Sequence, residues 1–249
     1  MPDQDALDRL SASLVARAGG YLRNPVRQER DTCAVCATPS AGFERCYPCR
    51  QHRGHAGLAD ATAFLTYAVA GRQSGHVMWG YKATPRPVGE HRMVVHLLVA
   101  LGLAGHAACP GALAGVPVTH WATVPSLPAK PGEHPLHQLV AGLAPGQEAR
   151  LTAAVQVRHP RGARPDHYRA GEPLPPGSHA LLMDDTWASG GHAQSAALAL
   201  RAAGAARVSL MVVARWLNRE HGSTARFVTE LAGRDYDPGI CPWTGGDCP

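Results

Sequence analysis

The 249-residue sequence lacks an apolar run long enough to cross a membrane. Its longest apolar region, residues 93–109, is interrupted by His96 and His106, whereas a membrane-spanning helix needs about 20 consecutive apolar residues. The first 24 residues begin with acidic side chains and contain no continuous apolar core of the kind that secretory signals carry. These absences predict no membrane span and favour a cytoplasmic location.

The sequence also lacks internal repeats and any dense block of Lys and Arg. Residues 158–169 are the most basic stretch, but they alternate Arg with Pro and Gly, which is typical of a mobile loop and not of a recognition helix. Hydrophobic residues make up 45% of the chain and charged residues 17%. This composition predicts one substantial core, or one domain with a small appendage. The net charge of +5 leaves a phosphorylated small molecule or nucleic acid open as a partner.

Four of the seven cysteines form two CxxC pairs in the stretch CAVCATPSAGFERCYPCRQH. They are Cys33, Cys36, Cys46 and Cys49. Two such pairs, separated by a short loop, can surround one tetrahedral ion, and thiolate sulfur suits Zn²⁺. A pair of disulfides or free thiols is the alternative, which a reducing compartment disfavours. Four thiolates leave no open coordination position, so we expect a structural zinc and not a catalytic one.

The remaining cysteines give a weaker signal. Cys109 stands alone and is predicted to be a small buried apolar residue. Cys241 and Cys248 lie in the Pro- and Gly-rich stretch DYDPGICPWTGGDCP. They could pair with each other, or bind a metal with help from Asp235 or Asp237.

Helical and strand-like segments alternate along the middle of the chain. Helices are expected within residues 1–30 and over 88–106, 134–143 and 192–204, and strands over 119–125, 151–157, 179–183 and 207–214. This alternation predicts an α/β protein with a parallel sheet covered on both faces. We divide the chain into an N-terminal helix and cysteine module (1–56), an α/β domain (57–220) and a C-terminal tail that contains Pro, Gly and Cys (221–249). Within this tail, residues 235–249 are expected to lack regular structure.

The stretch LLMDDTWASGGHAQSAA, residues 181–197, carries the strongest chemical signal. Its apolar start is expected to finish a buried strand, which places Asp184 and Asp185 at the carboxyl end of the sheet, where α/β proteins bind ligands. The glycine-containing turn that follows leads into a helix N-terminus, a combination that binds phosphate. Carboxylates beside a phosphate cradle suit the hydroxyls and phosphate of a sugar phosphate. Alternatively, the two acids only cap the turn.

This stretch resembles the signature of the type I phosphoribosyltransferases: an apolar strand, two acidic residues, two or three variable positions, Thr-Thr-Gly, one residue and Thr, then a helix. Ser189 and Gly190 keep the centre of the pattern. Ala188 stands where the first Thr is usual, and His192 stands where the last Thr is usual.

A closer likeness is to the ComF-like branch of that family, which joins an N-terminal zinc ribbon to a phosphoribosyltransferase domain. GHVMWGYK resembles a stretch of that branch ending in Lys-Tyr, here reversed as Tyr81 and Lys82. THWATVPSLPAKPGEHPLHQL resembles its Val-Pro strand end and the Arg-Gly-Phe-Asn-Gln segment that follows. Gln138 is kept, and Lys130 or His134 would have to replace the arginine. The likeness extends from residue 33 to about residue 217.

The resemblance implies a type I phosphoribosyltransferase-like fold and Mg²⁺-dependent transfer of ribose 5-phosphate from phosphoribosyl diphosphate to an acceptor, with release of diphosphate. Asp184 and Asp185 would be the catalytic residues that hold the ribose hydroxyls. The cationic stretch containing Arg158, Arg161 and Arg164 is a candidate lid over the diphosphate. The implied phosphoribosyl diphosphate ligands are Ser126, Lys130, Arg158, Arg161, Thr186, Ala188, Ser189, Gly190, Gly191 and His192.

The acceptor is not identified by the sequence. In this family a hood outside the core selects the acceptor, and here we expect it to come from the N-terminal region, residues 215–218 and the tail. Trp216 or Trp243 could stack on a planar acceptor, and an amine acceptor is equally compatible. Two alternatives stay open: a non-catalytic nucleic-acid-handling protein, since the ComF-like branch is linked to DNA uptake, and a sensor of phosphoribosyl diphosphate.

Overall fold

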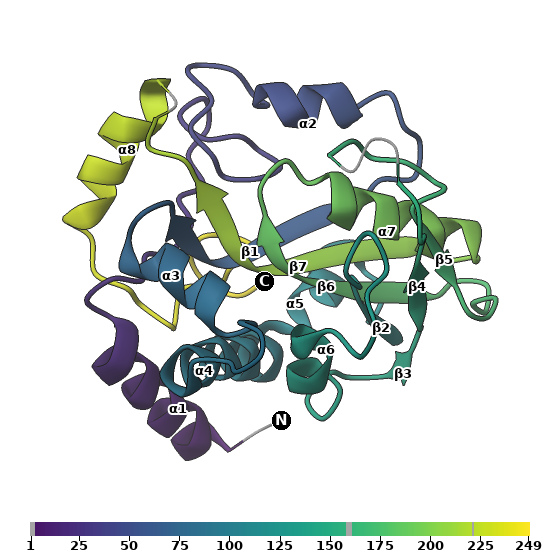
Figure 1. The fold of residues 1–249 in the computed structure, drawn as a ribbon, viewed down its shortest axis with the longest axis horizontal. Coiled ribbons are helices and arrows are strands. Elements are labelled where there is room, and N and C mark those ends of the chain that lie inside the picture. Colours follow the sequence, from purple (N-terminus) through teal and green to yellow (C-terminus); the bar gives the residue numbers. More distant parts are fainter. Residues whose placement is uncertain (1–2, 158–160, 221) are drawn as a thin grey trace.

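The computed structural model describes residues 3–157, 161–220 and 222–249. Its centre is a five-stranded sheet with the order β1-β7-β6-β2-β3 (Figure 1). The strands are β1 (Ala61–Val69), β2 (His120–Thr123), β3 (Gln147–Glu148), β6 (His179–Trp187) and β7 (Arg207–Leu217). All neighbouring strands of this sheet run parallel. The structure therefore confirms the predicted parallel α/β sheet.

Helices cover both faces of this sheet (Figure 1). The helices are α1 (Gln4–Ala18), α2 (Tyr47–His52), α3 (Gln73–Gly80), α4 (Gly89–His106), α5 (Cys109–Ala114), α6 (Pro135–Val140), α7 (Gly191–Ala202) and α8 (Gly222–Ala232). Side chains of β6 alternate between two buried clusters, as strand geometry requires. Leu181 and Met183 pack in the cluster that contains α1, α4 and α6. Ala180 and Leu182 pack in the other, with α7 and the four clustered cysteines.

The central strands are apolar on both faces. Every residue from Val208 to Ala214 in β7 is buried, which is the pattern of a parallel strand covered by helices above and below. The third buried cluster lies at the carboxyl ends of β1 and β7, where Phe227 of α8 packs edge-on against Tyr67 with 5.6 Å between ring centroids.

Several elements differ from the sequence-based expectation. Strand β1 and helices α3 and α8 were not predicted. The strand expected over residues 151–157 forms only β4 (Leu151–Ala153), which pairs antiparallel with β5 (Tyr168–Ala170) in a separate two-stranded sheet. Residues after α8 form turns without a helix or strand, as expected. Among the described helices, none has the length and apolar character needed to cross a bilayer.

The connections on the two sides of β2 and β6 run in opposite directions. From β2 the chain passes through α6 to β3, and from β6 it passes through α7 to β7. The carboxyl ends of β2 and β6 therefore flank a topological switch point, which is where open parallel sheets form a binding crevice.

Candidate functional site

The carboxylate of Asp185 is the meeting point of three segments. Its Oδ2 atom accepts a hydrogen bond from the Tyr81 hydroxyl at 2.6 Å and lies 2.5 Å from the Lys82 ammonium, both just after α3. Nε2 of His134, the residue that caps α6, lies 3.7 Å from the same oxygen. The backbone N–H of Asp185 donates to Oδ1 of Asp184 at 2.9 Å. The sequence-predicted acid pair is thus buried in a polar network.

The two carboxyls have opposite electrostatic environments. For Asp184, burial and the neighbouring Asp185 charge raise the pKa to about 8. For Asp185, burial acts in the same direction, but Lys82 and His134 outweigh it and hold its pKa below the ordinary value. Near neutral pH the pair therefore carries one proton and one negative charge, and Lys82 balances that charge.

The position of this pair in the sheet differs from the prediction. Strand β6 does not end before Asp184; it continues to Trp187 because β7 pairs with it as far as Arg215. On the other side β2 ends at Thr123, which pairs with Met183. Asp184 and Asp185 are thus inside a strand, yet they lie past the end of its β2 neighbour, at the switch point.

The turn after β6 depends on two glycines. Gly190 caps α7 with φ +85°, and a Cβ atom there would lie 2.1 Å from the Trp187 ring. A Cβ on Gly191 would lie 2.2 Å from the backbone oxygen of Arg161. Only glycine fits both positions without displacing its neighbours. The turn leads into the N-terminus of α7, a 12-residue helix whose free backbone N–H groups favour anion binding.

Residues 161–164 lie against this turn. The Ser189 hydroxyl donates to the carbonyl of Arg161 at 3.0 Å, and the backbone N–H of Arg164 donates to the Ser195 hydroxyl of α7 at 2.8 Å. A phosphate in the turn would compete with the Arg161 carbonyl for the Ser189 hydroxyl. The predicted cradle is therefore covered by part of the predicted lid, while Arg158 lies outside the described residues.

The other residues predicted for the phosphate loop have mixed environments. The Thr186 hydroxyl is buried and has no hydrogen-bond partner within the described part of the chain. Ala188 is exposed and contributes no side-chain polar group. His192 is half-buried in the first turn of α7, close enough to His167 for its charge to lower the pKa of His167, after the larger effect of burial.

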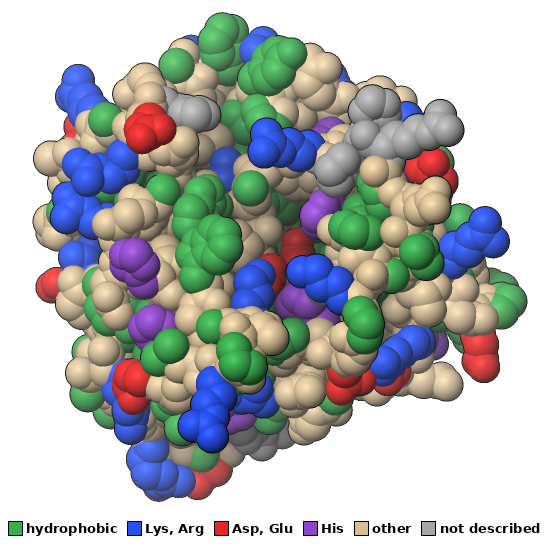
Figure 2. Space-filling view, viewed as in Figure 1, with side chains coloured by type: hydrophobic (Ala, Val, Ile, Leu, Met, Phe, Trp, Pro, Cys, Tyr) green, Lys and Arg blue, Asp and Glu red, His purple; other side chains and the backbone are tan. Residues whose placement is uncertain are grey.

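A pocket of about 480 Å³ opens beside the acid pair. It lies between the segment after β2, the start of α6 and strand β4, and its lining includes the predicted residues Ser126 and Lys130 together with Lys82 and His134. Figure 2 shows the molecule hollowed near the middle of this face, where basic, His and acidic side chains gather. Lys82 and His134 link the pocket to Asp185, because both also approach its carboxylate.

Charges in the pocket are partly paired. Arg150 lies 3.0 Å from Glu133 and 3.1 Å from Glu148, and His137 lies 3.2 Å from Glu133. Lys130 is exposed and has no carboxylate within ion-pair distance among the described residues. The pocket therefore has a cation available for an anionic ligand.

Sequence reasoning found some of these residues and missed others. Among the described residues, no member of the 184–192 stretch lines the pocket, so the phosphate turn and the pocket are two adjoining sites joined through Asp185. Arg150 and His137 were missed. Their ion pairs come from α6 and the β3–β4 region, whose juxtaposition no local spacing reveals.

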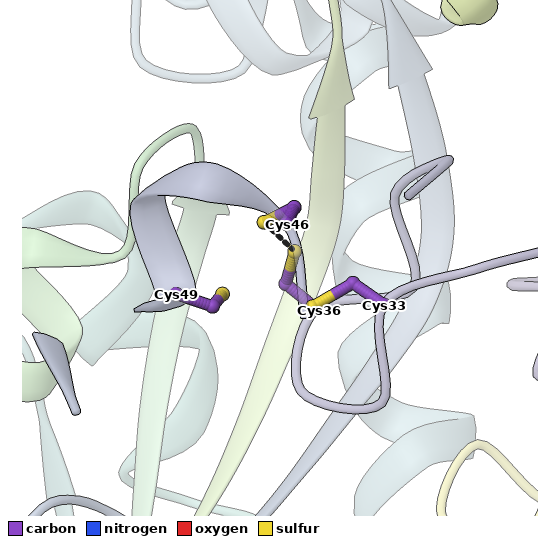
Figure 3. A group of neighbouring side chains, drawn as sticks. All are labelled: Cys33, Cys36, Cys46 and Cys49. Atoms are coloured by element: carbon purple, nitrogen blue, oxygen red, sulfur yellow. Dashed lines mark hydrogen bonds between the residues drawn. The ribbon is translucent and has the colours of Figure 1, made fainter. Parts of the chain in front are cut away.

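The four clustered cysteines form a candidate metal centre (Figure 3). Cys33 and Cys36 come from a loop, and Cys46 and Cys49 come from the first turn of α2; all four are buried. Their sulfur atoms lie within 4.8 Å of one another, and Cys36 and Cys46 are 3.5 Å apart. A tetrahedral ion with bonds of about 2.3 Å places its sulfurs about 3.8 Å apart. The cluster therefore fits one metal ion with four thiolate ligands.

The buried Arg215 of β7 connects this cysteine cluster to the phosphate turn. Its guanidinium donates to the carbonyl of Cys36 at 3.0 Å and to the carbonyl of Trp187 at 2.9 Å. The Tyr67 hydroxyl of β1 donates to the carbonyl of Ala37 at 2.5 Å. The cysteine module is thus fixed to the sheet at the place where the turn begins. The acceptor hood expected to include residues 215–218 stays a prediction.

Of the two tryptophans expected to meet an acceptor, Trp243 is buried, and its indole N–H donates to the carbonyl of His106 at 3.0 Å. Trp216 is half-buried and packs edge-on against Trp79 of α3, with ring centroids 6.4 Å apart. Trp79 is 68% exposed. An aromatic surface therefore exists, but it is formed by Trp216 and Trp79.

No protein-family model matches this chain, and no curated protein sequence matches it.

Proposed function

We propose that this protein binds phosphoribosyl diphosphate and transfers its ribose 5-phosphate to an acceptor, releasing diphosphate. One observation carries the proposal: a buried acid pair at the switch point of a parallel sheet adjoins both a glycine turn with a helix N-terminus and a lysine-containing pocket. In this proposal the acid pair binds the ribose hydroxyls of phosphoribosyl diphosphate, the glycine turn binds its 5-phosphate, and the lysine-containing pocket binds its diphosphate. The resemblance to type I phosphoribosyltransferases agrees with it.

The acid pair is proposed to hold the ribose hydroxyls. Protonated Asp184 can donate a hydrogen bond to a hydroxyl oxygen, whereas ionised Asp185 accepts one, so the pair offers both polarities. The ribose would take the place that the Tyr81 hydroxyl and Lys82 ammonium now occupy at Asp185. The 5-phosphate would bind at the turn, where it replaces the Arg161 carbonyl on Ser189.

The reaction breaks the bond between the anomeric carbon and a diphosphate oxygen, and the electron pair leaves with diphosphate. The acceptor atom bonds to the same carbon and loses a proton to solvent. Positive charge develops on the sugar, so the contribution of the chain is to orient the reactants and to stabilise the leaving group. Lys130 and Lys82 are the proposed cations for the diphosphate.

Magnesium would neutralise diphosphate oxygens when bound. The two glutamates of the pocket are already paired with Arg150, and Asp185 is paired with Lys82, so these residues do not form a protein cage for Mg²⁺. We therefore propose that Mg²⁺ enters with the diphosphate, as it commonly does at phosphate sites.

The cluster of Cys33, Cys36, Cys46 and Cys49 is proposed to bind a structural Zn²⁺. Four buried thiolates close the coordination sphere and leave no position for a substrate. The proposed role is mechanical: through Arg215, the cysteine module supports the start of the phosphate turn.

A planar acceptor is proposed to stack on Trp79, whose ring is exposed and held by Trp216. Trp79 lies three residues before Lys82, so it approaches the site from the same segment. An aromatic face of this kind binds a planar ring without requiring a particular hydrogen-bond pattern.

The test is diphosphate release from phosphoribosyl diphosphate and Mg²⁺ in the presence of a panel of nitrogenous bases and amines. We expect one acceptor class to give release that is abolished in an Asp184→Asn, Asp185→Asn variant. Binding without release by any acceptor would favour the sensor. Absence of binding, together with DNA affinity that falls steeply with salt, would favour nucleic-acid handling.

A further inference from the structure

The C-terminal segment and the end of α4 form a second cluster of metal-ligating side chains. It contains His106, Cys109, Cys241 and Cys248, whose ligand atoms all lie within 4.8 Å of one another. His106 is the last residue of α4 and Cys109 is the first of α5. The other two come from the tail, more than 130 positions later in the sequence. We propose that these four residues bind a second structural Zn²⁺, which fastens the tail to the α4–α5 corner.

The donor set and its spacing suit a tetrahedral ion. Nδ1 of His106 lies 3.3 Å from the Cys248 sulfur and 4.0 Å from the Cys109 sulfur. Three thiolates and one imidazole are a common set for structural zinc, and the two residues between His106 and Cys109 match the spacing of a zinc knuckle. None of these sulfurs is in a disulfide.

The local backbone brings the two tail cysteines together. Cys241 and Gly246 form a turn in which the Cys241 N–H donates to the Gly246 carbonyl at 2.8 Å, and the Gly245 N–H donates to the Cys241 carbonyl at 2.8 Å. Gly245 has φ +83°, which favours glycine. This turn returns Cys248 towards Cys241.

The tail after α8 contributes buried side chains to the core although it has no regular secondary structure. After α8 it has no helix or strand to hold it, yet Tyr236 and Trp243 belong to the main buried cluster. The Tyr236 hydroxyl donates to the carbonyl of Leu65 in β1 at 3.3 Å, and the indole of Trp243 donates to the carbonyl of His106 at 3.0 Å. A metal ion at the end of this segment would keep both side chains in the core, because release of the tail would break metal bonds as well.

The site is closed and structural. His106, Cys109 and Cys241 are buried, and Cys248 is exposed at the edge. Four protein ligands fill the coordination sphere, so no position remains for a substrate. The inference does not depend on the proposed transferase activity.

The test is the zinc content of the full-length protein, purified under reducing conditions and measured by elemental mass spectrometry. We expect two zinc ions per chain, one for each cluster. Cys248→Ser removes an exposed ligand without disturbing the core, and it should reduce the content to one. Asp247→Asn, at the neighbouring position, is the matched control and should retain two. One zinc ion in the unaltered protein, or two in Cys248→Ser, would overturn the proposal.

Cobalt substitution checks the ligand set by a second readout. Seven sulfurs contribute to Co²⁺ charge-transfer absorption if both clusters are loaded. His106→Gln should lose the bands of one site while the Cys33 cluster keeps its own. Mass spectrometry of freshly prepared protein without reductant shows whether these cysteines form a disulfide. A disulfide between Cys248 and either Cys109 or Cys241, with only one zinc ion bound, would contradict the second site.

Discussion

The ammonium group of Lys82 lies 2.5 Å from the carboxylate of Asp185, whereas the adjacent Asp184 is within ion-pair distance of no cation among the described residues. The pKa of Asp184 is therefore raised and that of Asp185 is lowered, although the two residues are adjacent in one strand. Because of this difference, we expect substitutions at the two positions to change the stability of the protein in opposite directions.

Asp184→Asn should stabilise the protein in mildly alkaline solution. Its pKa of about 8 lies far above the value of about 3.9 for an unfolded chain. The folded state then binds more protons than the unfolded state between about pH 4 and 8, so this carboxyl lowers stability progressively as pH rises through that window. Urea denaturation at pH 6 and pH 9 should show a stabilising effect of the substitution that is larger at pH 9.

Asp185→Asn is the matched comparison and should act in the opposite direction. The pKa of Asp185 is held low, so its stabilising contribution is present above the unfolded pKa and is lost as pH falls through the folded value. Its removal leaves the Lys82 ammonium without its carboxylate, at a cost of about 1–3 kcal/mol at neutral pH. Equal effects of the two substitutions would contradict the charge assignment.

Gly191→Ala should displace residues 161–162 from the phosphate turn. The added methyl group would meet the Arg161 backbone oxygen at 2.2 Å, so the covering segment must move, at a cost of about 1–3 kcal/mol. Trypsin should then cut faster after Arg161, which Gly162 follows. Gly105→Ala is the control, because Gly105 is exposed in α4 and a Cβ there has open space. It should be neutral or stabilise by up to about 1 kcal/mol. Unchanged cleavage in Gly191→Ala would show that the segment does not depend on this contact.

Arg215→Met should uncouple the cysteine module from the sheet. The carbonyls of Cys36 and Trp187 would lose a buried donor, and we expect a loss of about 2–4 kcal/mol in the free energy of unfolding. Arg207→Met, at the exposed start of the same strand, should cost less than about 0.5 kcal/mol. If both variants lost a similar free energy of unfolding, the hydrogen bonds of Arg215 would not contribute more to stability than an exposed arginine does.

Lys130→Ala should weaken binding of the diphosphate group and leave binding of the ribose 5-phosphate group unchanged. Lys130 lines the pocket and is not paired with a carboxylate among the described residues, so its removal should weaken phosphoribosyl diphosphate binding about tenfold. Affinity for ribose 5-phosphate, which lacks the diphosphate, should stay the same. Arg169→Ala, an exposed cation on β5, serves as the control. A parallel loss for both ligands would place Lys130 near the 5-phosphate instead.

Local patterns were sufficient for part of the fold and of the site. The CxxC spacing identified the Cys33 cluster because its ligands lie close in sequence. The apolar stretch before Asp184 identified β6, since burial on both faces leaves a continuous apolar run. The end of β6 was placed too early because the length of a strand depends on its partner, and β7 extends the pairing to Trp187.

What the sequence could not provide depends on contacts between distant residues. Strand β1 pairs with β7, more than 140 positions away, and its apolar run alone does not distinguish a strand from a buried helix. Lys82 meets Asp185 only after α3 and β6 have packed together. The cluster of His106, Cys109, Cys241 and Cys248 was missed for the same reason, since only the folding back of the tail brings its two pairs of residues together.

The most direct test of the central claim is calorimetric titration of phosphoribosyl diphosphate into the purified protein, with and without Mg²⁺, beside the Asp184→Asn, Asp185→Asn variant. The proposal predicts magnesium-dependent binding with a Kd in the micromolar range, about −8 kcal/mol, and its loss in the variant. No heat of binding under either condition, or the same binding in the variant, would contradict a sugar-phosphate site at the acid pair.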